Sequence, residues 1–183
     1  MVFKKTKFKG LFIIQPKIFS DDRGCFFESF KKVTFDEFIE KKIDFCQENE
    51  SQSNYGVLRG LHFQRPPYTQ SKLIKVIKGK VLDVVVDLRK NSATFLESFS
   101  IVLDDINKQQ LFVPKGFAHG FIALIPNTIS TYKVDNYYNP DFEEILDFKD
   151  EKLNIDWKVP YKNIIVSDKD LQVGKDLNNI YKF

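Results

Sequence analysis

The chain has few of the residues that build disulfide frameworks or metal centres. Its 183 residues include only two cysteines, Cys25 and Cys46, and two histidines, His62 and His119. The cysteines offer neither a disulfide framework nor a metal-binding pair, so we expect two reduced thiols in or near the core. Metal sites usually need three or more converging His, Cys or carboxylate ligands, and no His-X-His pair is present. The sequence therefore predicts no metal site.

Long apolar runs and one-sided charge are also missing. The start of the chain, Met-Val-Phe-Lys-Lys-Thr-Lys-Phe-Lys, has no apolar segment of the kind found in signal peptides, and no later stretch approaches membrane-spanning length. The net charge is only +3, with lysines scattered among acids, which argues against a nucleic-acid surface. We expect a cytoplasmic enzyme or binding protein with no membrane or nucleic-acid partner.

What is present is a composition typical of a globular protein. Hydrophobic residues make up 43% and charged residues 29%, and phenylalanine alone occurs 19 times. The length suits one domain with a substantial core, so a single domain over residues 1–183 is expected. No linker, low-complexity tract or internal repeat divides the chain.

Short apolar runs separated by turn residues predict an all-β fold. The expected strands cover residues 11–15, 25–30, 45–48, 57–64, 72–77, 80–88, 95–103, 110–113, 116–124 and 128–134. Lys78-Gly79, between two of these, is typical of a tight hairpin turn. About ten strands in one compact domain require a sandwich, jelly roll or barrel. After Pro140 the pattern weakens and predicts loops with short helices.

One helix is expected near the start of the chain. Thr34 and Glu37 have the spacing of a capping box, in which each side chain satisfies a free backbone N–H. Phe35, Phe38 and Ile39 then fall on one face of the helix. The sequence therefore predicts a short amphipathic helix that begins at the threonine.

Both histidines lie in glycine-flanked, aromatic-rich runs, Val-Leu-Arg-Gly-Leu-His-Phe-Gln (57–64) and Phe-Val-Pro-Lys-Gly-Phe-Ala-His-Gly-Phe (112–121). Histidine exchanges protons near neutral pH, so two histidines on hydrophobic strands indicate acid–base chemistry in a walled pocket. Lys72 begins the strand after His62, and a base near a fixed ammonium suits proton abstraction beside a carbonyl. The alternative is a hydrogen-bonded core histidine beside a surface lysine. Arg59 should face away from His62 unless Gly60 marks a bulge.

Tyrosines and arginines add further candidates. Tyr132, Tyr137 and Tyr138 cluster near one strand end, where a tyrosine can act as a general acid, stack on a base or sugar, or simply pack. Arg23 and Arg59 carry guanidinium groups whose geometry matches phosphate oxygens. These patterns leave the choice between a phosphate-bearing ligand and plain packing open.

Several of these blocks together resemble a known family. The chain resembles the dTDP-4-dehydrorhamnose 3,5-epimerases from about residue 8 to about residue 172. The matching motifs are Pro-Lys-Ile-Phe-Ser-Asp-Asp-Arg-Gly (16–24), Phe-Phe-Glu-Ser (26–29), the 57–64 block, residues 84–89, Pro-Lys-Gly-Phe-Ala-His-Gly-Phe (114–121), Tyr-Lys (132–133) and Ser-Asp-Lys-Asp (167–170). The resemblance implies a cupin-type jelly roll with a few short helices.

The resemblance also implies roles for individual residues. His62 matches the catalytic base, oriented by the carboxylate of Asp170, and Tyr132 matches the acid on the opposite side of the sugar ring. Lys72 would stabilise the enolate. The positions expected to bind substrate are Phe19, Arg23, Glu28, Gln47, Asn49, Arg59, Gln64, His119, Tyr138, Glu143 and Lys169.

The implied reaction epimerises C3 and C5 of dTDP-4-dehydro-6-deoxy-D-glucose, giving dTDP-4-dehydro-L-rhamnose for rhamnose and O-antigen synthesis. It requires no metal, nicotinamide or other cofactor, in keeping with the missing GxGxxG fingerprint. In this family part of each site can come from the partner subunit, so a homodimer is implied. Three alternatives stay open: an epimerase acting at one centre, a 3,4-ketoisomerase on a related nucleotide sugar, and a non-catalytic nucleotide-sugar binding module.

Overall fold

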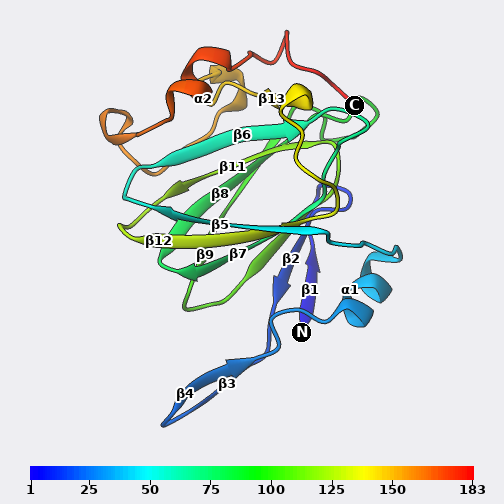
Figure 1. The fold of residues 1–183 in the computed structure, drawn as a ribbon, viewed down its shortest axis with the longest axis vertical. Coiled ribbons are helices and arrows are strands. Elements are labelled where there is room, and N and C mark those ends of the chain that lie inside the picture. The colour runs from blue at the N-terminus through cyan, green and yellow to red at the C-terminus, as the bar shows by residue number, and fades with distance from the viewer.

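The protein is a sandwich of two antiparallel sheets, shown by a computed structural model (Figure 1). It describes residues 1–183, with the side chains of residues 172 and 173 excepted. The six-stranded sheet has the order β1-β2-β10-β7-β12-β5, with bounds Val2–Lys5, Phe12–Gln15, Gln110–Val113, Lys72–Lys78, Thr128–Val134 and Gln47–Ser53. The five-stranded sheet has the order β13-β6-β11-β8-β9, with bounds Glu143–Ile145, Leu58–Gln64, Phe117–Ala123, Lys80–Asp87 and Ser98–Asp104.

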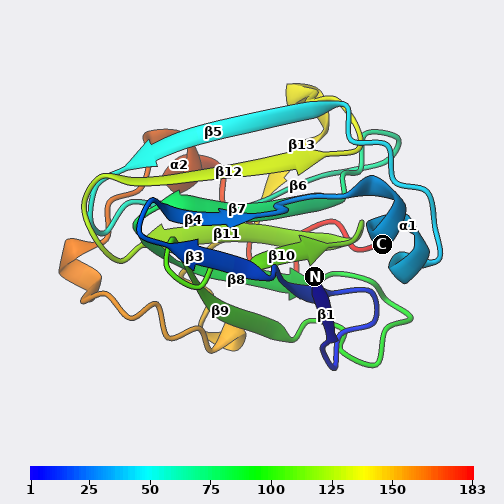
Figure 2. The ribbon, with the colours of Figure 1, turned by 90° about the horizontal axis from the view of Figure 1, so that it is seen from below.

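The strand order within the two sheets is that of a jelly roll. From β5 to β8, successive strands alternate between the two sheets. β8 and β9 are neighbours in the same sheet, and from β10 to β13 the strands alternate between the sheets again. The resulting sets are β5-β12-β7-β10 and β6-β11-β8-β9, and in Figure 2, seen from below, strands of the two sets overlap. The expected all-β jelly-roll architecture is confirmed.

Hydrophobic side chains fill the space between and behind the sheets. One cluster packs Ile74, Val85 and Phe117 between the layers, and a second packs Leu61, Val84 and related residues under the tail of the chain. β8 and β11 have every central residue buried, since each is covered on both faces. These two strands lie in the interior of the five-stranded sheet.

Most expected strands are present, with one wrong connection between them. Lys78-Gly79 is not a hairpin turn, because β7 and β8 belong to different sheets. Gly79 has φ +92°, and a Cβ there would lie 2.4 Å from the Thr128 hydroxyl oxygen. The glycine therefore marks the corner at which the chain crosses from one sheet to the other.

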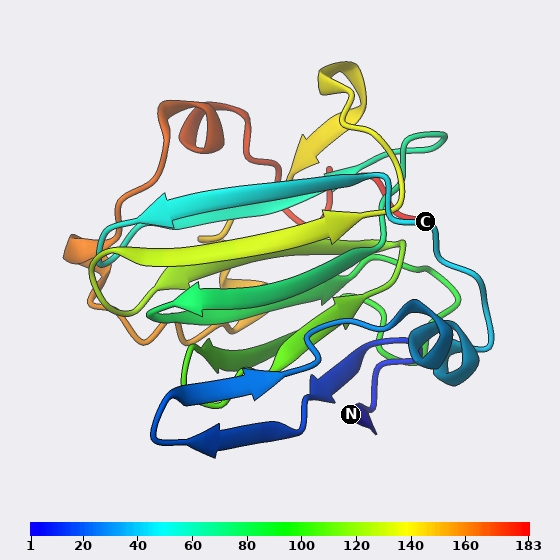
Figure 3. The ribbon, with the colours of Figure 1, turned by 60° about the horizontal axis from the view of Figure 1, so that its bottom comes forward.

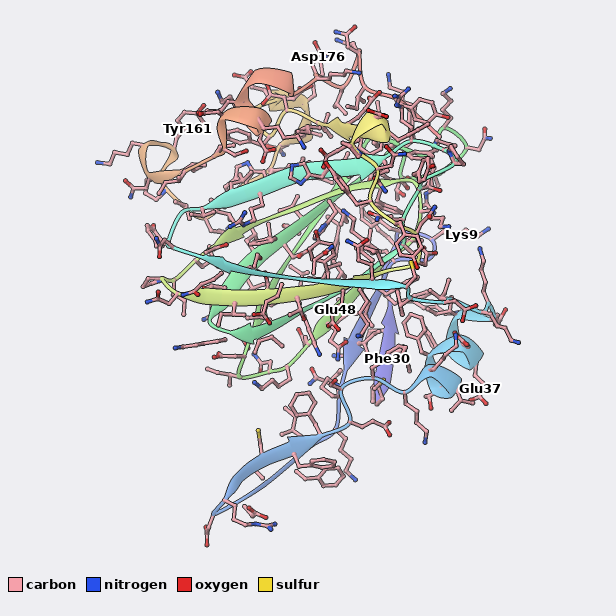
Figure 4. The ribbon with its side chains drawn as sticks, in the orientation of Figure 1. Lys9, Phe30, Glu37, Glu48, Tyr161 and Asp176 are labelled. Carbon is pink, nitrogen blue, oxygen red and sulfur yellow. The ribbon has the colours of Figure 1, made fainter. Side chains whose placement is uncertain are left out.

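The helix is present but begins earlier than expected. α1 spans Lys32–Ile39, its N-cap is Lys31 without a side-chain capping bond, and the predicted capping box at Thr34 is therefore wrong. Phe35 is buried as expected and contacts Phe30, which lies where the hairpin joins the helix, while Glu37 points outward (Figure 4). The helix is anchored by this aromatic contact rather than by a cap.

Two further expectations concern the surface. Both cysteines are free, but they are exposed rather than in or near the core, which corrects that expectation. Cys25 lies on the two-stranded hairpin β3–β4, Ile18–Asp21 and Gly24–Phe27, which extends away from the sandwich (Figures 1 and 3). The sequence pattern missed β1, β3 and β13.

The tail folds as expected, into loops and short helices. It contains the 3₁₀ turns η1, η2 and η3, at Pro140–Phe142, Glu151–Leu153 and Tyr161–Asn163, and the helix α2, Asp168–Val173. α2 and β13 lie next to β6, at the top of Figure 1. Among the residues described, no helix is long and apolar enough to cross a bilayer.

Candidate active site

Two adjoining cavities open where β6, β11 and β12 meet the tail. The larger has a volume of about 540 Å³ and the smaller about 240 Å³. The sequence-predicted residues that line the larger are Asn49, Arg59, His62, Lys72, His119, Tyr132, Glu143, Lys169 and Asp170. The smaller shares several of these and adds Gln47, Gln64 and Tyr138. The predicted catalytic residues therefore lie around one hollow.

His62 on β6 is paired with Asp170 of α2. The Nε2 atom lies 2.8 Å from the Asp170 Oδ1, and the His62 side chain is 29% exposed while the carboxylate is 7% exposed. In a neutral ring Nε2–H then donates to the carboxylate, which leaves the Nδ1 lone pair free to accept a proton. The pair has the arrangement of an oriented general base.

The Asp170 carboxylate is held in its ionised form by hydrogen bonds. Burial acts to raise its pKa, but the contacts with His62, the Gly60 N–H and Ser167 outweigh burial and lower it. Ser167 caps α2 by accepting a hydrogen bond from the Asp170 N–H at 3.2 Å. Local helix capping thus positions a carboxylate 108 residues along the chain from its histidine.

Lys72 reaches the same hollow from the first residue of β7. It is 8% exposed, and its Nζ lies 3.4 Å from the His62 carbonyl oxygen and 5.8 Å from the centre of the Tyr132 ring. Burial lowers the pKa of Lys72 to about 8, opposed by the nearby charges of Asp83 and Glu143. The lysine is buried and cationic at neutral pH, so the surface-lysine alternative is wrong.

Tyr132 on β12 lines both cavities. Burial raises its pKa, with Asn49, its register partner on β5, acting in the opposite direction. The phenol therefore stays protonated at neutral pH and can supply a proton rather than accept one. Its neighbour Tyr138 lines the smaller cavity, whereas Tyr137 is a largely exposed side chain.

His119 on β11 is the register partner of His62, but its environment is different. Its Nε2 lies 3.0 and 3.1 Å from the two oxygens of Asp83, and the Asp83 side chain is fully buried. Burial lowers the pKa of His119, opposed by Asp83. The sequence reasoning missed Asp83, although a single charge within the apolar run Val-Leu-Asp-Val-Val-Val (81–86) was a usable signal.

The glycines beside the histidines allow two backbones to approach closely. A Cβ on Gly60 would lie 2.6 Å from the Gly120 Cα, and a Cβ on Gly120 would lie 2.6 Å from the Arg59 carbonyl oxygen. The β6–β11 register shifts at this point. This irregularity lets Arg59 and His62 line the same cavity. In a regular strand the two side chains would lie on opposite faces, and a bulge at Gly60 was the expected exception.

Polar side chains fix the rest of the wall. Arg59 donates to the Ser53 hydroxyl at 3.2 Å, and Gln47 donates to Asn49 at 2.9 Å. Gln64 is buried, and its side-chain amide forms two hydrogen bonds with the loop after β12. It donates to the Tyr137 carbonyl oxygen and accepts from the Asn139 N–H. Gln64 thus shapes the cavity wall with its amide already engaged by the protein.

An ion pair joins α2 to β13 beside the hollow. Lys169 of α2 contacts the Glu143 carboxylate of β13, and its Nζ is 3.4 Å from the Tyr138 hydroxyl. Glu143 raises the pKa of Lys169, so the lysine stays cationic. No group of three or more described His, Cys, Asp or Glu residues is arranged to hold a metal ion.

Three predicted binding residues lie outside this hollow. Phe19 and Arg23 are exposed on the β3–β4 hairpin, where Arg23 is paired with Asp21, and Glu28 follows the hairpin on the surface. They line neither of the two cavities. The structure therefore does not bring these residues to the site of their own chain.

Comparison with known proteins identifies the family to which the chain belongs. The family model described as dTDP-4-dehydrorhamnose 3,5-epimerase matches residues 5–177. The chain belongs to this family. It is 42% identical to the dTDP-4-dehydrorhamnose 3,5-epimerase of Shigella flexneri over 97% of both chains. As a member, it is an isomerase of dTDP-rhamnose biosynthesis.

Solved structures agree with this family on the fold. The crystal structure of the family member from Elizabethkingia anophelis matches with a TM-score of 0.94 and 42% identity, over 99% of each chain. A 3,5-epimerase from Legionella pneumophila, solved in complex with dTDP-4-keto-L-rhamnose, matches with a TM-score of 0.92 and 40% identity, over 98% of this chain and 94% of that one. The expected family and epimerase activity are both confirmed.

Proposed function

We propose that the chain epimerises C3 and C5 of dTDP-4-dehydro-6-deoxy-D-glucose without a cofactor, using His62 as the base. The observation that carries this assignment is the 2.8 Å contact between His62 and Asp170 at the edge of the larger cavity. The 4-keto group acidifies the hydrogens on both neighbouring carbons, since either carbanion is delocalised onto the same oxygen. One base can therefore serve both carbons in turn.

Each epimerisation moves one proton off carbon and returns one to the other face. The His62 Nδ1 lone pair takes the proton, and the imidazolium that forms is stabilised by Asp170. Positioned proton transfer of this kind contributes ~10²–10⁴-fold to rate. Tyr132, which is protonated until this step, donates to the opposite face. Before the second carbon reacts, the His62 imidazolium releases its proton to solvent and the Tyr132 phenolate takes one up.

Lys72 supplies the charge that the intermediate needs. As a carbon loses its proton, negative charge develops on the C4 oxygen, and a buried ammonium stabilises that charge more than the neutral ketone. Fixed charges of this kind are worth a few kcal/mol of barrier lowering, roughly. The 5.8 Å separation of Lys72 from the Tyr132 ring allows one sugar ring to contact both residues.

The nucleotide part of the substrate is proposed from charge and from the relatives. Arg59 presents a guanidinium to the cavity and Lys169 an ammonium at its mouth, and both suit a diphosphate. Tyr138 provides a half-exposed ring beside them for the base or sugar. The dTDP-sugar bound to the Legionella relative supports the same ligand here.

We further infer a homodimer located in the cytoplasm, in which each hairpin completes the site of the partner. The hairpin extends away from its own cavity and exposes Phe19 and its register partner Phe26, at 53% and 73%. Rings so exposed favour burial against another surface. Arg23 and Glu28 would then reach the partner's nucleotide.

Subunit complementation tests this arrangement. Arg23→Ala and His62→Ala proteins, each weakly active alone, are mixed under conditions that exchange subunits. If Arg23 serves the partner's site, half of the sites in mixed dimers contain both native residues and activity returns. If activity stays at the level of the two parents, Arg23 acts in its own subunit or not at all.

Solvent exchange tests the reaction itself. We expect the protein, mixed with dTDP-4-dehydro-6-deoxy-D-glucose in heavy water, to place deuterium at both C3 and C5, as read by NMR. Uptake at C3 alone would identify a single-centre epimerase. Movement of the keto group to C3 would identify a ketoisomerase, and binding without exchange would leave a binding module.

A further inference from the structure

The feature that the proposed mechanism does not use is Asp83, a carboxylate buried in the middle of β8. Its side chain is fully buried and lies between the buried residues Leu82 and Val84 in sequence. A carboxylate without water requires strong compensation, and replacement by an apolar residue would remove that cost. A buried charge at this position, next to the larger cavity, therefore calls for a purpose beyond packing.

The direct partner of Asp83 is His119. Both carboxylate oxygens lie within 3.1 Å of the His119 Nε2. Because burial lowers the pKa of His119, the ring is neutral at pH 7 and carries its proton on Nε2. The contact fixes the tautomer and turns the Nδ1 lone pair away from the carboxylate, but it leaves the negative charge of Asp83 uncompensated.

The cation available to balance Asp83 is Lys72. Lys72 lines the larger cavity together with four of the residues named above, His62 of β6, His119 of β11, Tyr132 of β12 and Glu143 of β13. Asp83 of β8 lies directly behind this wall, in contact with His119, and both Asp83 and Glu143 act to raise the pKa of the lysine. Of the two carboxylates among them, Glu143 already has its own cation in Lys169. No lysine or arginine of the described chain forms an ion pair with Asp83.

We propose that Asp83 is a positioning residue that keeps the Lys72 ammonium charged for the enolate and holds His119 in a single tautomer. This inference rests on the proposed role of Lys72 in the reaction. Asp83 is too deep to touch the sugar, and it acts through the two side chains that do line the cavity.

The sign of the effect on pH dependence follows from the charges. Lys72 is active as a cation, and burial lowers its pKa to about 8 while Asp83 raises it in part. Removal of the Asp83 charge lowers that pKa further, so the ammonium loses its proton at a lower pH. The alkaline limb of the activity profile should therefore move toward acid by about one pH unit.

The test compares Asp83→Asn with Asp87→Asn. Asparagine keeps the shape of Asp83 and its acceptor oxygen. Asp87 is an equally buried carboxylate on the same strand, but its partners are Arg89, Ser92 and Thr94, away from the cavity. Solvent exchange into the 4-keto sugar is measured from pH 6 to pH 10, with thermal unfolding recorded for each protein.

We expect the alkaline limb to shift in Asp83→Asn, with activity at pH 8 falling several-fold more than at pH 6.5. Asp87→Asn should lose thermal stability but keep the wild-type profile. An unshifted limb in folded Asp83→Asn, or the same shift in Asp87→Asn, would overturn the inference. Absence of exchange by the wild type would instead overturn the proposed function, so the two failures are distinct.

A second variant covers the case in which Asp83→Asn does not fold. Lys72→Arg retains Asp83 and carries a cation that stays charged over the whole range. The remaining exchange activity should then show no decrease at alkaline pH. An unchanged alkaline limb in Lys72→Arg would show that titration of Lys72 does not cause this limb. The proposed role of Asp83, which acts through Lys72, would then be refuted.

Discussion

The molecule contains two histidine–aspartate pairs on neighbouring strands, and they differ in almost everything except the contact. In each, Nε2 meets a carboxylate, and His62 and His119 are register partners. The His62 side chain is 29% exposed, whereas the His119 side chain is 6% exposed. The first pair borders open space and the second is enclosed.

The origin of each carboxylate explains the difference. Asp83 lies on β8, in the middle of the sandwich, and cannot move without the sheet. Asp170 comes from a short tail helix that packs against the outside of the site. A base must gain and lose a proton and so needs access to its ligand, while a structural pair gains from enclosure. From this contrast we propose that His62 transfers the proton and that His119 stays fixed in its enclosed pair with Asp83.

Asp170→Asn should produce the largest effect on this comparison. The asparagine can no longer stabilise the imidazolium, so we expect kcat to fall ~10²-fold or more. Asp168→Asn, an exposed neighbour on the same helix, is the control and should keep wild-type activity. A loss below threefold in Asp170→Asn would show that His62 works without its carboxylate.

Tyr132→Phe should have an intermediate effect. Removal of the hydroxyl impairs return of the proton more than its initial loss, so product formation should fall about tenfold or more while deuterium exchange persists. The ratio of exchange to product, followed by NMR, measures this directly. The exposed Tyr161→Phe serves as the control (Figure 4). Equal loss of exchange and product would assign Tyr132 to binding.

Ser167→Ala should have the smallest effect. Loss of the α2 cap costs about 1 kcal/mol of stability and loosens the backbone that carries Asp170, so activity should drop a few-fold. Ser98→Ala removes a hydrogen bond to the Leu153 carbonyl, far from the cavity, at a similar cost of about 1 kcal/mol. Unfolding midpoints and kcat are compared. Equal activity in both variants would mean that the cap does not tune the site.

Apolar runs separated by turn residues predicted most of the fold, because long strands such as β8 and β12 stand out clearly in the sequence. The predicted hairpin turn at Gly79 was wrong, because a hairpin turn and a crossing between two sheets favour the same residue types. The start of α1 was wrong because packing of Phe35 against Phe30, rather than a cap, determines where the helix lies. The connection between strands and the start of a helix are thus determined by packing contacts that local sequence patterns do not show.

The site divides in the same way. His62, Lys72 and Tyr132 stand in distinctive motifs, and the structure places them around one hollow, although their roles stay predictions. Asp83 was overlooked because an isolated acid in an apolar run has no partner until β8 and β11 pair. The role of Arg23 stays a prediction, because the residue lies outside both cavities of its own chain and its proposed contact with a partner subunit is not written in the pattern of one chain.

The most direct test of the account compares deuterium exchange in His62→Asn and His119→Asn. At saturating dTDP-4-dehydro-6-deoxy-D-glucose in heavy water, the first variant should lose exchange at both C3 and C5 by at least ~10²-fold. The second should still exchange both carbons, at a reduced rate. Exchange at either carbon that survives in His62→Asn and vanishes in His119→Asn would reverse the assignment of the two pairs.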